Sequence, residues 1–176
     1  MALKPTIYKA RIALSDLERN LYDNLNLTVA LHPSETLQRM VARVLAFCLN
    51  YQDDLTFTKG LSDVEEPDLW VYTIDDKVQL WIDVGEPDPE RVRKSARKAS
   101  QVVVYSFNQK SDTWWQQSRA KISKNGVKVV RFNPESVISL SELVERTMDW
   151  SITITGESAF VATPNGEVEI DWQTLV

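Results

Sequence analysis

Two aspartates, Asp68 and Asp83, lie beside two apolar segments that are expected to be neighbouring strands, Leu69–Ile74 and Val78–Val84. With the turn centred on Asp75-Asp76, the two aspartates face each other across an antiparallel pair, with Cβ atoms about 5 Å apart. Like charges directly opposite destabilise a sheet unless a positive group offsets them. A divalent cation such as Mg²⁺ or Mn²⁺ suits paired carboxylates, and a Lys or Arg side chain would also serve. In the alternative reading, both aspartates lie in water at fraying strand ends.

Hydrophobic matching sets the register of this strand pair, because it gives one wholly apolar or β-branched face that can be buried. A slip of one residue would scramble both faces. The matched pairs are Leu69 with Ile82, Val71 with Leu80 and Thr73 with Val78 on the buried face, and Trp70 with Trp81, Tyr72 with Gln79 and Asp68 with Asp83 on the other.

A basic helix follows the strand pair. Asp88 as cap and Pro89 at the first helical position predict its start, and Val92, Ala96 and Ala99 form a narrow apolar stripe. Its basic residues are candidates for phosphate contacts or for steadying the carboxylate pair, although a solvated helix face is the plainer interpretation. They form two flanks, Arg91, Lys94 and Lys98 on one and Arg93 and Arg97 on the other.

The elements that must position these residues indicate an α/β domain covering residues 1–176, with a mixed sheet flanked by helices. Hairpins are expected at both ends, from residues 5–14 with 21–31, and from Ala159–Ala162 with Glu167–Ile170 across Asn165-Gly166. Helices are predicted from a cap at Ser34 to Cys48, from Asp88, over about 112–122, and over Pro134–Met148. The other predicted strands are Leu55–Lys59, Gln101–Phe107, Val127–Phe132 and Ser151–Thr155.

Composition limits the function classes. The net charge of −5 argues against nucleic-acid binding over the whole surface, although a local basic patch remains open. One cysteine, Cys48, excludes an internal disulfide and a Cys-rich zinc site, and it is expected to be a buried thiol. The one histidine, His32, is expected to be structural. No apolar run has the length of a signal peptide or a membrane span, so a cytoplasmic location is the default expectation.

Several segments distributed along the chain together resemble the pattern of the YaeQ family of small bacterial proteins, and the likeness covers essentially the whole chain. The resemblance implies a fold similar to the PD-(D/E)XK nucleases, the restriction-endonuclease-like fold, and a link to compensation for a lost transcription elongation factor. The segments are Met1-Ala2-Leu3-Lys4, His32-Pro33-Ser34-Glu35-Thr36, Phe57-Thr58-Lys59-Gly60-Leu61, Glu66-Pro67-Asp68, Leu80–Gly85 and Trp114-Trp115-Gln116-Gln117.

The same resemblance assigns roles to residues. Pro67-Asp68 matches the Pro-Asp of the nuclease motif, and Asp83-Val84 matches the first two positions of (D/E)-X-K, which implies that Asp68 and Asp83 bind Mg²⁺ or Mn²⁺. The third motif position departs from the pattern, because it is Gly85 and not the lysine that helps to activate water. Candidates to replace that lysine are Lys94 or Lys98 from the basic helix and Lys59 from the preceding strand, and Glu35 resembles an acidic residue that some members place at the first helix.

Two hypotheses follow. In the first, the protein is a divalent-metal-dependent phosphodiesterase acting on nucleic acid, with Asp68, Asp83 and Lys94 or Lys98 in the site. In the second, it is a non-catalytic module that binds nucleic acid or a protein of the transcription machinery through the basic helix and the aromatic face. The missing motif lysine favours the second. The sequence leaves open DNA or RNA, the partner and the oligomeric state.

Overall fold

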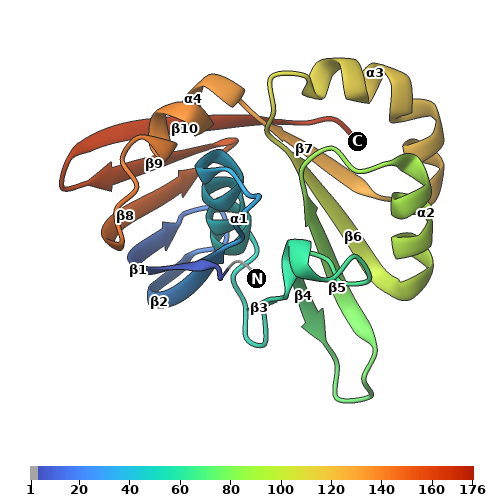
Figure 1. Cartoon of the computed structure of the whole chain (residues 1–176), viewed down its shortest axis with the longest axis horizontal. Coiled ribbons are helices and arrows are strands. Elements are labelled where there is room, and N and C mark those ends of the chain that lie inside the picture. The colour runs from blue at the N-terminus through green and yellow to red at the C-terminus, as the bar shows by residue number, and fades with distance from the viewer. Residues whose placement is uncertain (1–3) are drawn as a thin grey trace.

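One ten-stranded sheet runs through the computed structural model, which describes residues 4–176 (Figure 1). The strand order is β2-β1-β8-β9-β10-β7-β6-β5-β4-β3. The segment Met1-Ala2-Leu3 of the family-like start lies outside the described residues. The strands are β1 Thr6–Asp16, β2 Leu21–Leu31, β3 Thr56–Phe57, β4 Leu69–Tyr72, β5 Val78–Val84, β6 Ala99–Ser106, β7 Lys128–Phe132, β8 Thr147–Thr155, β9 Ser158–Thr163 and β10 Gly166–Thr174.

The sheet has two parts that β10 joins. Gly166–Asp171 of β10 pairs with β9, whereas Trp172–Thr174 pairs with β7. In one part, β1 and β2 form an antiparallel hairpin, β1 pairs in parallel with β8, and β8 pairs antiparallel with β9. In the other part, β7, β6 and β5 are parallel, and β5 continues into antiparallel β4 and β3. The expected mixed α/β sheet is thus confirmed.

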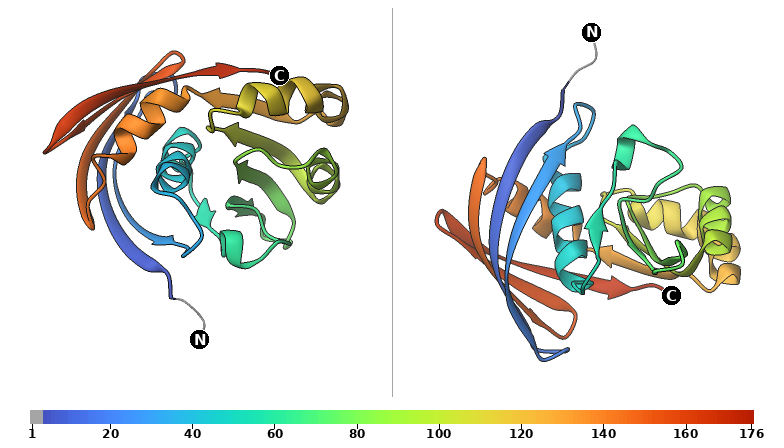
Figure 2. Two further views of the ribbon diagram at one scale, coloured as in Figure 1. Left: turned by 45° about the horizontal axis from the view of Figure 1, so that its top comes forward. Right: turned by 90° about the horizontal axis from the view of Figure 1, so that it is seen from below.

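The helices cover this sheet on two sides. The sheet curves around α1, which packs against both parts and forms the larger apolar core with them (Figure 2). On the outer side of β5, β6 and β7, α2 and α3 cover a second, smaller core built around Trp81 and Val92. The helices are α1 Leu37–Leu49, α2 Pro89–Lys98, α3 Ser111–Ile122 and α4 Pro134–Ser141, with short 3₁₀ turns η1 Gly60–Ser62 and η2 Ser123–Asn125.

Local signals in the sequence predicted several of these elements. The two terminal hairpins form as expected, β1 with β2 and β9 with β10. Helix α2 begins at Pro89, and the Asp88 side chain accepts a hydrogen bond from the backbone N–H of Glu90. The register of β4 and β5 is confirmed for Leu69, Trp70 and Val71, and an irregularity after Val71 shifts the remaining pairs.

Two predicted helix boundaries are wrong, and the predicted strands Leu69–Ile74 and Ser151–Thr155 are observed as Leu69–Tyr72 and Thr147–Thr155. The cap of α1 is Thr36 and not Ser34, because the Ser34 hydroxyl is engaged with His32 Nδ1 at 2.7 Å. The predicted helix Pro134–Met148 ends at Ser141, because the chain pairs with β1 from Thr147 onward and buries Met148 in the core of the sheet. Among the described residues, none of the helices is long and apolar enough to cross a membrane.

Candidate functional site

The two aspartates line a common pocket at the carboxyl end of β5. Ligands of open α/β sheets bind beyond the carboxyl ends of parallel strands, and this pocket has that position beside β5 and β6. Its volume is about 430 Å³. Asp68 enters it from the start of β4, Asp83 and Gly85 from the end of β5, Arg39 from α1 and Arg91 from α2. We call this hollow the carboxylate pocket.

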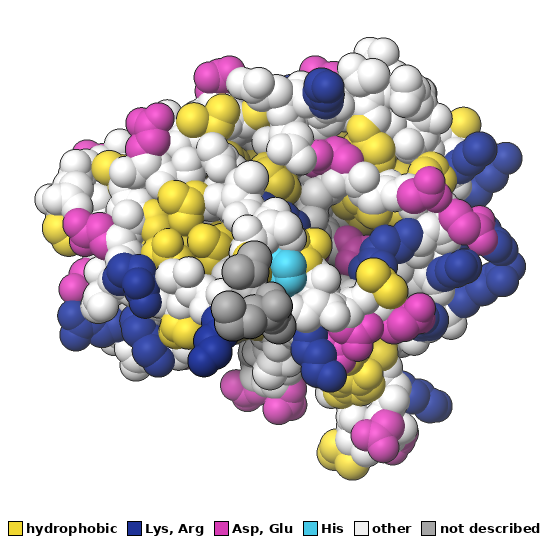
Figure 3. Space-filling model, in the orientation of Figure 1, with side chains coloured by type: hydrophobic (Ala, Val, Ile, Leu, Met, Phe, Trp, Pro, Cys, Tyr) yellow, Lys and Arg dark blue, Asp and Glu magenta, His cyan; other side chains and the backbone are white. Residues whose placement is uncertain are grey.

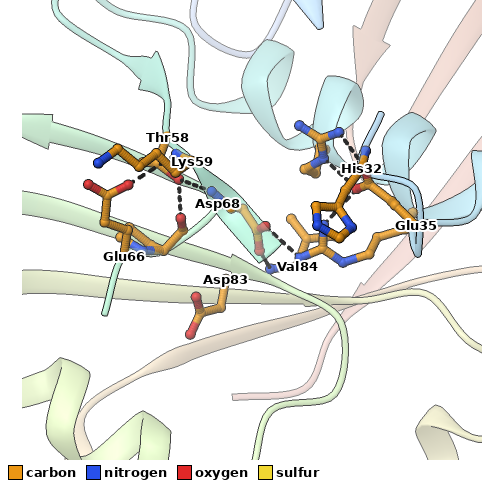
Figure 4. Close-up of polar contacts among 12 residues, drawn as sticks. His32, Glu35, Thr58, Lys59, Glu66, Asp68, Asp83 and Val84 are labelled. Carbon is orange, nitrogen blue, oxygen red and sulfur yellow. Dashed lines mark hydrogen bonds and ion pairs between the residues drawn. The ribbon is translucent and has the colours of Figure 1, made fainter. Parts of the chain in front are cut away.

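Asp68 is held by α1 and by the end of β5. It is only 5% exposed. Its Oδ2 accepts a hydrogen bond from the backbone N–H of Val84 at 2.7 Å, and its Oδ1 accepts one from Nη2 of Arg39 at 2.5 Å (Figure 4). Both oxygens of this carboxylate therefore have partners within the protein.

Arg39 belongs to a buried chain of charges. Its Nη1 donates to Glu35 at 2.7 Å, and Arg43 donates two further bonds to the same carboxylate, both at 2.7 Å. Burial disfavours the charge on Arg39, but the attraction of Asp68 and Glu35 outweighs this cost and raises the pKa of Arg39 above its ordinary value. Glu35, which sequence reasoning placed at the start of this helix, therefore anchors two arginines.

Asp83 is held from the opposite side, by α2. It is 4% exposed, and Arg91 grips it with a two-pronged contact in which Nε and Nη2 each donate at 3.1 Å. The same guanidinium donates to the carbonyl oxygens of Val64 and Glu66, which ties the segment before β4 to α2. Burial raises the pKa of Asp83 above its ordinary value, although Arg91 acts in the opposite direction. The nearby charge of Asp68 adds to the increase.

The lysines predicted to assist the carboxylates lie elsewhere. Lys94 is exposed on α2 and is not among the residues that line the carboxylate pocket. Lys98 makes a surface ion pair with Glu65 at 3.2 Å and lies over the Trp81 ring. Lys59 lines a neighbouring hollow. Of the predicted basic residues, Arg91 steadies a carboxylate.

Sequence reasoning missed Arg39 altogether. Glu35, Arg39 and Arg43 follow a spacing of four, which places them on one side of a helix, and this was the available signal. Asp68, the partner of Arg39, is 29 positions away in the sequence, and no local sequence pattern predicts that the two are in contact.

A divalent metal does not fit this arrangement of residues. All four oxygens of Asp68 and Asp83 accept hydrogen bonds, and three of the four contacts come from guanidinium groups that carry a full positive charge. The described part of the chain holds no group of three or more His, Cys, Asp or Glu side chains suited to a metal ion. Gly85, at the position of the motif lysine, has a φ of +128°, which side chains rarely tolerate.

A second feature lies on the outer side of α2. A hollow of about 340 Å³ between α2 and the end of α3 is lined by Arg93, Lys121 and Lys124 and also by Asp88 and Glu90. Three further basic residues extend the positive charge along α2, namely Lys94, Arg97 and Lys98. We call these six basic residues the α2–α3 basic surface. Figure 3 shows Lys and Arg side chains gathered on the side of the molecule where Figure 1 places these helices. Among the described residues, Lys94, Arg97, Lys121 and Lys124 form no ion pair.

Comparisons with known proteins agree with one another. The family model described as "YaeQ protein" matches residues 1–172. Proteins named "Uncharacterized protein YaeQ" from Salmonella typhi and Escherichia coli K12 are each 36% identical, with 98% of both chains covered. The crystal structure of YaeQ protein from Xanthomonas axonopodis pv. citri superimposes with a TM-score of 0.93 at 33% identity, covering 97% of this chain and 98% of that one. The crystal structure of YaeQ protein from Pseudomonas syringae superimposes with a TM-score of 0.93 at 32% identity, covering 98% of this chain and 96% of that one.

Proposed function

The chain belongs to the YaeQ family, and from this premise we propose that it is a non-catalytic protein that binds nucleic acid through the α2–α3 basic surface, on a scaffold related to the PD-(D/E)XK nucleases. The observation that carries the proposal is a contrast between two sets of charges. The arginines around the carboxylates are held in ion pairs, whereas Lys94, Arg97, Lys121 and Lys124 form no ion pair within residues 4–176.

The arrangement of these cations suits a phosphate backbone. Arg93 and Arg97 are four residues apart, as are Lys94 and Lys98, so α2 presents two rows of positive charge along its exposed side. Lys121 and Lys124 widen the surface across α3 and η2. Phosphate contacts of this kind release counterions and require no particular base sequence, so binding is expected to weaken steeply with salt.

The scaffold part of the proposal rests on the position of the two aspartates. Asp68 directly precedes β4, and Asp83 is the next-to-last residue of its antiparallel neighbour β5, in line with the motif positions that the resemblance assigns to them. The change at the third motif position coincides with a backbone that favours glycine. The motif therefore supports a shared origin for the scaffold, while the arginine contacts support the loss of its chemistry.

Fluorescence anisotropy with labelled duplex and single-stranded DNA and RNA tests the proposal. We expect binding to all phosphate backbones at low salt and a linear fall of log K with log salt concentration. Charge reversal at Lys94 and Lys121 should abolish binding at moderate salt. The matched control reverses Lys9 and Lys77, which change the net charge equally but lie outside the basic surface. Equal loss in both double variants would show that net charge alone matters and would contradict the proposal.

Two other functions are outcomes of the same samples. The carboxylate pocket also contains Asp63, Glu66 and Glu86, and this acidic lining makes metal-dependent hydrolysis of nucleic acid the second candidate, against the poor fit of a metal at Asp68 and Asp83. Cleavage with Mg²⁺ or Mn²⁺ that is lost in Asp83→Asn would establish it in place of our proposal. A protein of the transcription machinery is the remaining alternative. Absence of binding to every nucleic acid at low salt would reject the proposal and leave a protein partner.

A further inference from the structure

We infer that Arg91 takes the place of a divalent cation beside Asp83, so that the two buried aspartates of the pocket are compensated by guanidinium groups of the protein and exclude Mg²⁺ and Mn²⁺. The inference concerns the pocket alone and does not depend on the basic surface. Its measurements contain no nucleic acid, so its failure is separate from the failure of the proposed function.

Arg91 contacts Asp83 and two backbone carbonyls with its one planar guanidinium group. The guanidinium of Arg91 is a planar fork, and it meets the Asp83 carboxylate with both prongs at 3.1 Å. Its remaining contacts go to the carbonyl oxygens of Val64 and Glu66 at 2.6 and 2.9 Å. Carboxylate and carbonyl oxygens are the ligands that hard divalent cations prefer. Arg91 therefore contacts, on the Asp83 side of the pocket, oxygen atoms of the kinds that such a cation would bind.

Each buried aspartate of the pocket already has a counter-charge. Asp68 pairs with Arg39 and Asp83 with Arg91, and Glu35, which shares Arg39, is also paired with Arg43. A buried carboxylate needs a compensating charge, and here each already has one. A divalent ion in contact with both aspartates would meet two guanidinium groups at close range, and this repulsion opposes its binding.

The residue at the third motif position agrees with a site that holds no metal. A lysine there is useful when a metal-bound water must be activated, and a site without a metal has no use for it. The chain has Gly85 at this position, with a φ of +128° and no atom within 4 Å of the place where a Cβ would stand. The space is open, but the backbone conformation is one that suits glycine. The absence of the motif lysine and the presence of the Arg91 contact are thus both consistent with a pocket that holds no metal.

The pocket should become a metal site when the guanidinium is removed. In Arg91→Gln, Asp83 loses its counter-charge, while its oxygens and the carbonyls of Val64 and Glu66 remain. We expect the wild-type protein to show no Mn²⁺ binding at millimolar concentration by calorimetry and by the Mn²⁺ electron paramagnetic resonance signal. Arg91→Gln should bind one Mn²⁺ at least tenfold more tightly than the wild type. The double variant Asp83→Asn/Arg91→Gln should lose that binding again.

Two further variants act as controls. Arg93 lies on the same helix, and its guanidinium pairs with exposed Glu90. The variant Arg93→Gln should therefore bind Mn²⁺ no better than the wild type. Arg91→Lys keeps a positive charge in the pocket and should also exclude Mn²⁺. Wild-type binding of Mn²⁺ that Asp83→Asn abolishes would overturn the inference, and this measurement needs no arginine variant to fold. Equal Mn²⁺ affinity in Arg91→Gln and Arg93→Gln would overturn it as well.

Discussion

Asp83 carries its charge in a place that disfavours it, and Arg91 is what makes that charge tolerable. The carboxylate is nearly fully buried, and burial is the main reason that its pKa is raised. When Arg91 is removed, the buried charge of Asp83 is left without compensation. When Asp83 is replaced by a neutral group, both the cost of burying its charge and the attraction to Arg91 disappear. The two partners should therefore respond unequally to substitution.

We predict that Arg91→Gln lowers the free energy of unfolding by about 2–3 kcal/mol, because it leaves a buried carboxylate uncompensated. Asp83→Asn should change it by less than about 1 kcal/mol, because the partly exposed Arg91 can be solvated. The double variant should recover most of the loss in Arg91→Gln. Urea denaturation of the four proteins gives the coupling energy. Equal losses in the two single variants would contradict this account of the pair.

The raised pKa of Asp83 also predicts a pH dependence. Between the ordinary value of 3.8 and the higher value in the folded state, the folded protein binds more protons than the unfolded chain at this group. Its contribution to stability is therefore full below the ordinary pKa and is lost as the pH rises through the folded-state pKa. The stability of the wild type relative to Asp83→Asn should fall over this interval and then stay constant. Urea denaturation from pH 3 to pH 8, with exposed Asp75→Asn as the control, measures it.

At the scale of elements, the sequence predicted what is fixed locally. Asp88 and Pro89 specify the start of α2 through a cap and a preset φ, and both depend on neighbouring residues alone. The register of β4 and β5 followed from side-chain alternation. The end of α4 could not be predicted, because Met148 fits the apolar period of a helix as well as the core face of a strand. Pairing with β1, more than a hundred residues away, decides between them.

The site was predictable only where it depends on neighbouring strands. Adjacent strands brought Asp68 and Asp83 to one pocket, and this followed from the strand register. Of their counter-charges, Arg91 was one of several candidates on the basic helix and Arg39 was missed. The two arginines come from helices on opposite sides of the sheet, and the packing of those helices is a property of the whole fold. A sequence can indicate that a carboxylate pair needs a positive partner, whereas the choice between metal, lysine and arginine depends on distances in three dimensions.

The end of β5 offers a test of the argument about the motif lysine. Gly85→Asn should lower the free energy of unfolding by about 2 kcal/mol, because a φ of +128° lies outside the left-handed region that asparagine tolerates. Gly126→Asn is the matched control, because Gly126 has a φ of +67° inside that region and is equally open. A similar cost in both variants, measured by urea denaturation, would remove backbone conformation as the reason for glycine at the motif position.

At the scale of the whole molecule, the two parts of the sheet depend on the last strand. β10 leaves β9 at Asp171 and pairs with β7 through Trp172, Gln173 and Thr174, and the ring of Trp172 meets Phe132 edge-on at 6.0 Å. Backbone bonds between Val129 and the final residues Leu175 and Val176 extend this contact. The carboxylate pocket lies in one part, and the hairpin β1–β2 lies in the other. The backbone pairing between the two parts therefore depends on a short seam, while the core around α1 is common to both.

We predict that deletion of residues 172–176 lowers the stability of the protein and separates its unfolding into two transitions, because the seam supplies the backbone pairing between the parts. Calorimetry should show a van't Hoff enthalpy below the calorimetric one. Cys48 gives a second readout, because burial raises its pKa to about 12 and shields it from thiol reagents until α1 is exposed. Gln173→Ala, which keeps the backbone bonds, is the control and should unfold in one step. A single transition in the deletion variant would show that α1, packed between the two parts, suffices to couple them.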